Sequence, residues 1–275
     1  MKRILSITNV LGVLLFCGAK SVAQGSSPVG AAKNVAATRQ PGASLDTSLR
    51  NEVDNAKRLA ADWLTAHQQP DGSWGSATNN TLLTPIAWLA LKGMDNAVDA
   101  VARDRAVVWL DSQPIDGSAS VDALIWRLQM TILALPDTPE RESRIQELDH
   151  ATQPLFNQAG AYSRWLYYAL TYRTTDSALP PRLSAQRQLD RIAPDYPLNT
   201  QNTETFWFFA RLINRYADGV WLRGTEALDW RNDFARALIN AQRKDPAGGA
   251  YWNAETGDAR IRATAFALLA LREID

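Results

Sequence analysis

The sequence has a single cysteine, Cys17, and only two histidines, His67 and His150, among its 275 residues. Cys17 falls in the N-terminal segment that we expect to be removed on export. The mature chain would then hold no thiol for a disulfide, a zinc site or nucleophilic catalysis. The two histidines fall near the ends of different predicted helices, which is typical of solvated side chains. These scarcities predict that the protein uses no metal ion and no cofactor.

The chain also lacks a net charge, and its mature part lacks a long apolar run. Its 29 Lys and Arg residues balance 29 Asp and Glu residues, which gives no electrostatic basis for binding nucleic acid. After residue 23, no apolar stretch approaches the roughly 20 residues of a transmembrane helix. The sequence contains no phosphate-binding Gly-rich loop, no dinucleotide fingerprint and no Gly-x-Ser-x-Gly nucleophile motif.

The first 23 residues have the features of a secretory signal peptide. Lys2 and Arg3 precede a mostly apolar run over 4–16, and Ser21-Val22-Ala23 offers a small-x-small cleavage site. We therefore expect a secreted or periplasmic protein. Residues 24–46 are rich in Gly, Ser, Ala and Pro and are predicted to form a flexible linker. The folded domain is expected over 47–275.

Within that domain, apolar residues recur with the 3.6-residue period of helices, and no strand is predicted. The pattern predicts an all-α domain of ten helices in five hairpins. The hairpins are 47–68 with 82–93, 96–112 with 120–135, 139–151 with 161–174, 181–192 with 201–217, and 225–243 with 259–273. The second helix of each hairpin carries less charge than the first, which suits an inner position packed on both sides.

A turn motif, QQPDGSWG over 68–75, joins the helices of the first hairpin, and weaker copies occur over 108–118 and 238–252. The Asp-Gly step at Gly72 predicts a tight turn with positive φ. In the second helices, 84–91 aligns with 264–271, and one position is tryptophan at 88, 126, 165 and 207. A recurrence of this length predicts repeated helical units whose faces are buried only by their neighbours.

The motif resembles the QW-type repeat of the squalene–hopene cyclase and prenyltransferase superfamily. The resemblance implies an α/α toroid, in which the Gln and Trp of each motif tie successive repeats together. The toroid could be closed or open, because full cyclase domains have more than five hairpins. Gln68 or Gln69 with Trp74, and Gln242 with Trp252, match that pattern. The chain departs from the family in its chemistry. The Asp-rich DxDD acid of the cyclases, the Asp, Cys and His zinc ligands of the prenyltransferases and the Cys–Gln thioester of other relatives are all absent from the mature chain.

Two acidic residues are the candidates for catalysis, Asp122 and Glu204. Both lie near the starts of predicted inner helices, at the end where the pocket of the family opens. A buried carboxylate there would have a raised pKa and could act as an acid. The alternative, which we favour, is that each caps its helix or complements the helix dipole from the first turn.

The candidate ligand-binding residues are five aromatic and two cationic side chains that could line a central cavity: Trp88, Trp126, Trp165, Tyr168, Trp207, Arg127 and Arg211. Aromatic faces suit either a polyprene or the apolar face of a sugar. The more economical interpretation is that the tryptophans pack as core, because one repeated position usually has one repeated packing role. The arginines could equally pair with Asp122 and Glu204.

These observations predict an exported, noncatalytic α/α-toroid domain that binds an apolar or saccharide ligand or a protein partner. The alternative is an enzyme, either a terpenoid-cyclase-like isomerase or a polysaccharide lyase acting in the central cavity. The inner surface distinguishes them. A deep aromatic pocket with a buried carboxylate favours a cyclase, an open groove with exposed Trp and Arg favours saccharide, and a filled centre favours a scaffold.

Overall fold

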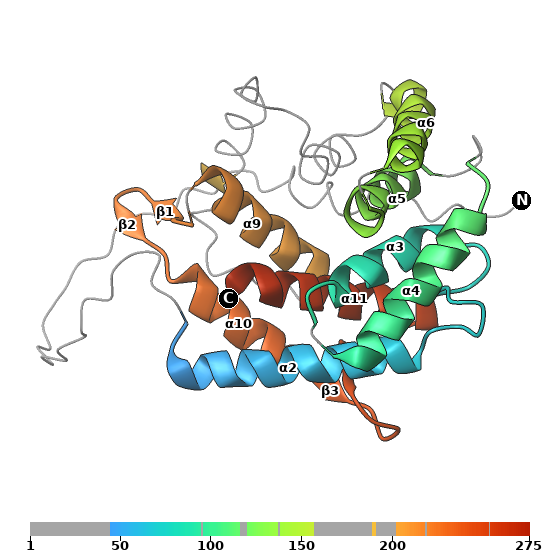
Figure 1. The fold of residues 1–275 in the computed structure, drawn as a ribbon. Helices are drawn as coiled ribbons and strands as arrows, with labels where there is room; N and C mark the ends of the chain where they lie inside the picture. The colour runs from blue at the N-terminus through green and yellow to red at the C-terminus, as the bar shows by residue number, and fades with distance from the viewer. Residues whose placement is uncertain are drawn as a thin grey trace, which may run out of the picture. The chain divides into compact units, whose positions relative to one another are not determined.

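Eight helices and four short strands make up the part of the chain described by a computed structural model (Figure 1). The described residues are 45–94, 96–115, 120–136, 138–156, 189–190, 202–217, 219–252 and 254–275. The predicted signal peptide, nearly all of the predicted linker, and the candidate residues Trp165 and Tyr168 lie outside them. Leu45, at the end of the predicted linker, is buried in the core.

The helices are α2 (Thr47–Ala66), α3 (Asn80–Leu91), α4 (Ala97–Ser112), α5 (Val121–Ala134), α6 (Pro139–Phe156), α9 (Thr203–Tyr216), α10 (Trp230–Ala241) and α11 (Gly257–Ile274). Several begin where the sequence offers a capping oxygen. The Asn96 side chain accepts from two backbone N–H groups of α4, Ser120 caps α5 and Thr256 caps α11, which satisfies N–H groups that have no partner within the helix. The protein is predominantly α-helical, as predicted.

The expectation of no strands is wrong at two places, and both affect the last predicted outer helix. Strands β1 (Leu222–Arg223) and β2 (Glu226–Ala227) form a hairpin where a helix was predicted to begin, so α10 starts only at Trp230. Strand β3 (Gln242–Lys244) pairs with β4 (Ala250–Trp252) in the final turn. Strands of two or three residues are too short to show the alternating pattern on which the prediction relied.

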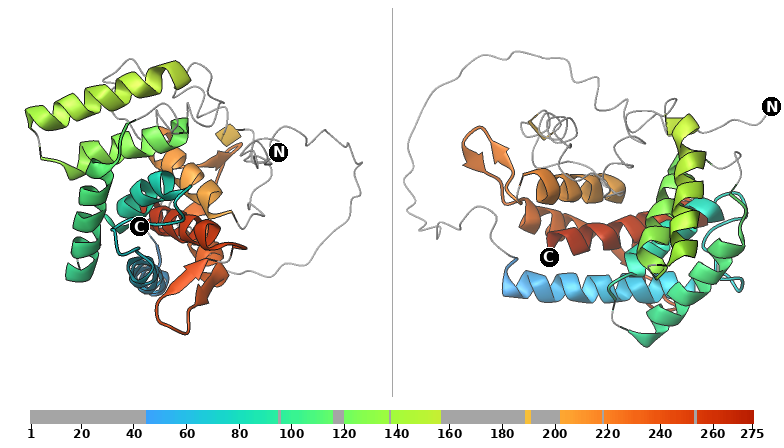
Figure 2. Two further views of the ribbon diagram at one scale, coloured as in Figure 1. Left: turned by 90° about the vertical axis from the view of Figure 1, so that its right-hand side faces the viewer. Right: turned by 45° about the horizontal axis from the view of Figure 1, so that its top comes forward.

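The helices pack in two rows. A central row runs in the order α5, α3, α11 and α9, each helix contacting the next, and a flanking row runs in the order α4, α2 and α10. Figure 2 (left) shows α2 nearly end-on, with α3 and α11 beside it. Helix α6 packs on α5. Helix α11 of the last predicted hairpin contacts both α2 and α3 of the first. These two hairpins are therefore direct neighbours.

The turn motif of the first hairpin ties it to the second. The Gln68 side chain donates to the carbonyl of Gly72 at 2.8 Å and to that of Ala102, in α4, at 2.7 Å. The Trp74 indole donates to the carbonyl of Leu64 at 2.7 Å, and its backbone N–H donates to the Thr84 hydroxyl. Gly72 has φ +97°, as predicted, and a Cβ there would lie 2.6 Å from the carbonyl oxygen of Arg105.

The last turn repeats this arrangement on the first helix. The Gln242 side chain donates to the carbonyl of Ala56 at 3.0 Å, and the Trp252 indole donates to the carbonyl of Leu238 at 2.8 Å. The Trp252 backbone N–H donates to the Thr264 hydroxyl, the residue aligned with Thr84. Gly249 has φ +74°, and a Cβ there would lie 2.9 Å from the carbonyl oxygen of Leu59.

The two turns dock on their neighbouring helices in the same register. The contacted residues Ala102 and Arg105 in α4 are both 46 positions beyond their counterparts Ala56 and Leu59 in α2. The turn of the first hairpin therefore meets α4 as the turn of the last hairpin meets α2. Such repetition is the mark of equivalent units packed by one rule.

Candidate functional site

The candidate acid Asp122 lies in the first turn of α5 and is 92% buried, with 8% of its surface exposed. It does not cap the helix, because the Ser120 hydroxyl accepts the bond from the backbone N–H of Ala123. Its Oδ1 atom is fully buried and has no hydrogen-bond partner. A carboxylate oxygen in that state is costly, although the positive end of the helix dipole favours a negative charge here.

The candidate acid Glu204 is held by a cation from another helix. It lies in the first turn of α9, where the Asn202 side chain caps the helix. Arg262, near the start of α11, donates to both Glu204 carboxylate oxygens, at 2.8 and 3.0 Å from Nη2 and 3.2 Å from Nε. The predicted partner Arg211 instead pairs with Glu273 at 2.6 Å. A bidentate guanidinium stabilises the ionised carboxylate, so this geometry suits an ion pair and not a proton donor.

The predicted aromatic column is buried in the described part of the domain. Trp88, Trp126 and Trp207 are 5%, 2% and 3% exposed. The Trp126 and Trp207 rings lie 5.3 Å apart, and both contact Phe266 of α11, at 5.7 and 5.4 Å between ring centroids. These three rings, from α5, α9 and α11, form one packed cluster, whose separations are typical of tilted and edge-to-face aromatic pairs.

Arg127 of α5 contacts the C-terminus of α4. Its guanidinium donates to the carbonyls of Leu110, Gln113 and Pro114, at 3.0, 2.6 and 2.9 Å. Burial, followed by repulsion from Arg144, lowers the pKa of Arg127 to about 10. Because carbonyls at a helix end have no partner within the helix, Arg127 acts as an internal cap for α4.

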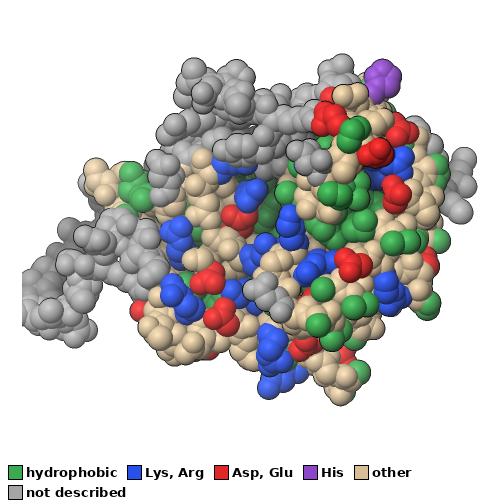
Figure 3. All heavy atoms as spheres, viewed as in Figure 1, with side chains coloured by type: hydrophobic (Ala, Val, Ile, Leu, Met, Phe, Trp, Pro, Cys, Tyr) green, Lys and Arg blue, Asp and Glu red, His purple; other side chains and the backbone are tan. Residues whose placement is uncertain are grey.

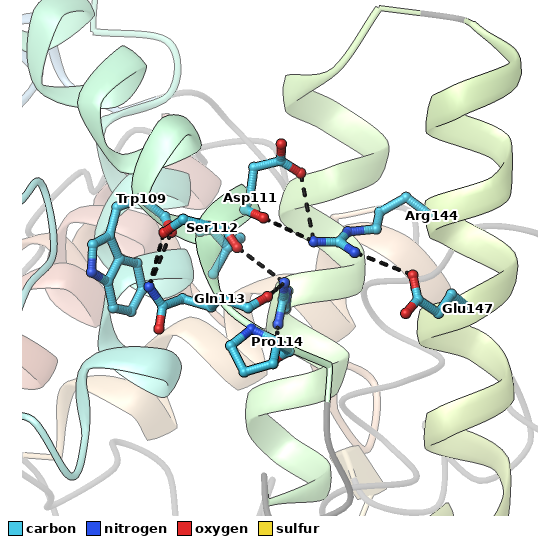
Figure 4. Close-up of polar contacts among 9 residues, drawn as sticks. Trp109, Asp111, Ser112, Gln113, Pro114, Arg144 and Glu147 are labelled. Atoms are coloured by element: carbon cyan, nitrogen blue, oxygen red, sulfur yellow. Dashed lines mark hydrogen bonds and ion pairs between the residues drawn. The ribbon is translucent and has the colours of Figure 1, made fainter.

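A small open hollow, with about 20 Å³ in which the centre of a water molecule fits, lies beside this cap between α4, α5 and α6. Its lining is mostly apolar and includes Val107, Met130 and Leu135, with Arg127 and Arg144 as the cations. Figure 4 shows Arg144 reaching from α6 toward Asp111 and Glu147, with which it forms ion pairs at 3.6 and 3.2 Å. The hollow is not lined by the predicted tryptophans, and its cations already have partners.

Sequence reasoning missed two residues that join the last hairpin to its neighbours, Arg262 and Asp258. Asp258 accepts hydrogen bonds from the Ser76 backbone N–H at 2.8 Å and from the Asn79 side chain at 2.6 Å. Burial raises the pKa of Asp258, but the bonds from Ser76 and Asn79 outweigh burial and leave that pKa below its ordinary value of 3.8. The position of both residues could have indicated this role, because they lie in the first two turns of α11, a helix that was predicted to be inner.

Helix α4 presents an exposed apolar stripe on its outer side. Val98, Val101 and Val108 are 62%, 59% and 72% exposed, and their spacing of three and seven residues puts them on one face of the helix. Across the described residues, no group of three or more His, Cys, Asp or Glu side chains could hold a metal ion. None of the described helices is long and apolar enough to span a membrane.

Comparison with known proteins found no matching family model, no matching curated protein and no matching solved structure.

Proposed function

We propose that the protein is an exported, noncatalytic α/α-toroid domain that serves as a scaffold for a protein partner. The observation that carries the proposal is the burial of Trp88, Trp126 and Trp207, since side chains that line a ligand cavity must be reachable from it. A filled aromatic centre favours a scaffold over a saccharide groove or a polyprene pocket.

The toroid arrangement is supported by the two docked turns. The turn of the first hairpin contacts α4 of the second, and the turn of the last hairpin contacts α2 of the first in the same register. Equivalent contacts between successive units, with the last unit meeting the first, are what a closed ring of hairpins requires. We therefore infer a closed ring of the squalene–hopene cyclase and prenyltransferase type.

The absence of catalysis is supported by the state of Glu204. Protonating an alkene needs an acid with a proton to donate in a dry pocket, whereas both Glu204 carboxylate oxygens accept hydrogen bonds from Arg262. The partner surface is assigned to the valine stripe of α4. Exposed side chains that repeat on one helix face are typical anchors for a protein contact.

The experiment is affinity purification of the exported protein from its native envelope or medium, with wild type compared with a Val101→Asp, Val108→Asp double variant. We expect a partner that binds wild type and is lost with the variant. Leu222→Asp, which changes a 48% exposed leucine on β1, is the control and should keep the partner. A partner retained by all three proteins would refute the α4 surface.

A second candidate function, a terpenoid-cyclase-like isomerase, is favoured by one observation: the buried, unpartnered Oδ1 of Asp122. Incubation of the purified protein with squalene and shorter polyprenes, followed by product analysis, tests it. We expect no cyclised product. Product that disappears in Asp122→Asn would overturn the noncatalytic proposal and identify the acid.

A further inference from the structure

Two arginines from different helices converge on the C-terminal end of α3. Arg103 of α4 donates through Nη1 to the carbonyls of Leu91 and Met94, at 2.8 and 3.0 Å. Arg272 of α11 donates through Nη1 to the carbonyls of Leu89 and Ala90, at 2.8 and 3.3 Å. The carbonyls of Leu89, Ala90 and Leu91 lie within about one helical turn of 5.4 Å, and the charge of Arg103 acts on Arg272.

Lys92 places a third cation at the same helix end. Its ammonium group donates to the carbonyl of Leu133 in α5 at 3.1 Å and lies 5.6 Å from the centre of the Trp88 ring. Burial lowers the pKa of Lys92, and the charges of Arg272 and Arg103 lower it further. We call Lys92, Arg103 and Arg272 the α3 cation cluster.

The charge of this cluster is not neutralised within the described residues. None of the ion pairs among them includes a member of the cluster. The acid that acts on Arg272, Glu273, is bonded to Arg211 and to Asn214. The carbonyl end of a helix supplies only about half a negative charge. The charges of Asp99 and Glu273 act on Arg103 and Arg272 without forming ion pairs with them, so the three cations keep a positive excess that these two acids reduce.

The cluster also keeps hydrogen-bond donors available. Within the described structure, both arginines use only Nη1 for their bonds to α3. Gly93 lies beside the Arg272 Nη2 atom, and a Cβ there would be 3.1 Å from it. Gly93 has no side chain that could contact this Nη2 atom. Figure 3 shows Lys and Arg side chains next to Asp and Glu side chains across the middle of the face seen in Figure 1.

We propose that the α3 cation cluster binds a tetrahedral oxyanion group, sulfate or phosphate, either as a free ion or carried on a polysaccharide. Guanidinium nitrogens and an ammonium group are the donors that tetrahedral oxyanions prefer in proteins. The site is separate from the valine stripe, so it stands or falls independently of the proposed scaffold function.

The test is titration of the purified protein with sodium sulfate and sodium phosphate at constant ionic strength, with sodium chloride as the balancing salt. Thermal stability and amide chemical shifts are the readouts. We expect saturable binding of both ions, weakened about tenfold in Lys92→Gln by the loss of a charge-assisted bond and largely kept in Lys92→Arg. Lys244→Gln, which removes an exposed cation on β3, is the matched control and should bind as wild type does.

A response no greater than that to chloride would overturn the proposal. An equal loss of affinity in Lys92→Gln and Lys244→Gln would also overturn it, because it would indicate a general effect of net charge. Parallel titrations with dextran sulfate and neutral dextran distinguish the two sources. Binding of dextran sulfate more tightly than free sulfate supports a polymeric ligand, and binding of free sulfate alone supports a small ion.

Discussion

Replacing Gly249 with alanine tests whether the last turn must dock on α2 as closely as it does. Gly249 has φ +74°, and a Cβ there would lie 2.7 Å from the backbone nitrogen of Trp63 and 2.9 Å from the carbonyl oxygen of Leu59. Both atoms belong to the backbone of a helix and cannot move aside by rotating a side chain. The turn and α2 would have to separate.

The expected cost has two parts. Holding an L-residue at positive φ costs about 1–2 kcal/mol, and forcing an extra carbon into a packed contact costs about 1–3 kcal/mol. Gly249→Ala should therefore lower the free energy of unfolding by about 2–5 kcal/mol. At about 2–4 °C per kcal/mol for a domain of this size, the melting temperature should fall by roughly 4–20 °C.

The adjacent Gly248 provides the control. It also has a positive φ, +114°, but a Cβ there would meet nothing within 4 Å. Gly248→Ala should show only the backbone cost, and Gly224→Ala, at φ +63° and also in open space, should behave in the same way. Urea and thermal unfolding followed by circular dichroism measure all three variants. If Gly249→Ala and Gly248→Ala melt together, the close contact with α2 contributes nothing, and the docking argument fails.

Three further changes are expected to have distinct outcomes. Glu204→Gln should lower the free energy of unfolding by about 1–3 kcal/mol, because it leaves the Arg262 guanidinium partly buried without its counterion; urea unfolding measures it. Gly72→Val should lower the melting temperature far more than Gly257→Val, since only Gly72 has positive φ and a backbone atom within 3 Å of a Cβ. Asp258→Asn should destabilise the protein at pH 7. Because the pKa of Asp258 is lower in the folded protein than in the unfolded chain, the ionised carboxylate stabilises the fold at pH values above about 3.8, and this stabilisation is lost as the pH falls below that value. The stabilities of wild type and Asp258→Asn should therefore converge in acid. An equal loss of stability in Asp258→Asn at pH 7 and at pH 3 would contradict this.

The elements that sequence reasoning located best are those with a strong local signal. Helix α4 was predicted over 96–112 and runs over Ala97–Ser112, because Asn96, which caps its start, is a local signal. The aligned threonines Thr84 and Thr264 have the same role, accepting a bond from the backbone N–H of the motif tryptophan. The alignment of two short segments placed these threonines at equivalent positions, but it did not predict the hydrogen bond that they share.

The sequence alone could not predict which charged side chains pair with each other. Glu204 and Arg262 are 58 residues apart, and their meeting depends on which helix lies beside α9. Arg127 was a candidate for the cavity, but it instead caps α4 through three carbonyls. Composition reveals that a cation is present near a helix. It cannot reveal whether that cation will face a carboxylate, a carbonyl or a ligand, because each choice is made by a neighbour distant in sequence.

The use of arginine as an internal cap has a consequence for function. A carboxylate partner would cancel the charge of the guanidinium, whereas a carbonyl partner satisfies its N–H groups and leaves the charge in place. Arg103 and Arg272 are bound in this second way, and Lys92 adds to them. The same bonds that finish α3 therefore assemble positive charge at its end. The stability of a helix terminus and the attraction of an anion follow here from one arrangement, and only a measurement of binding at constant ionic strength separates the two roles.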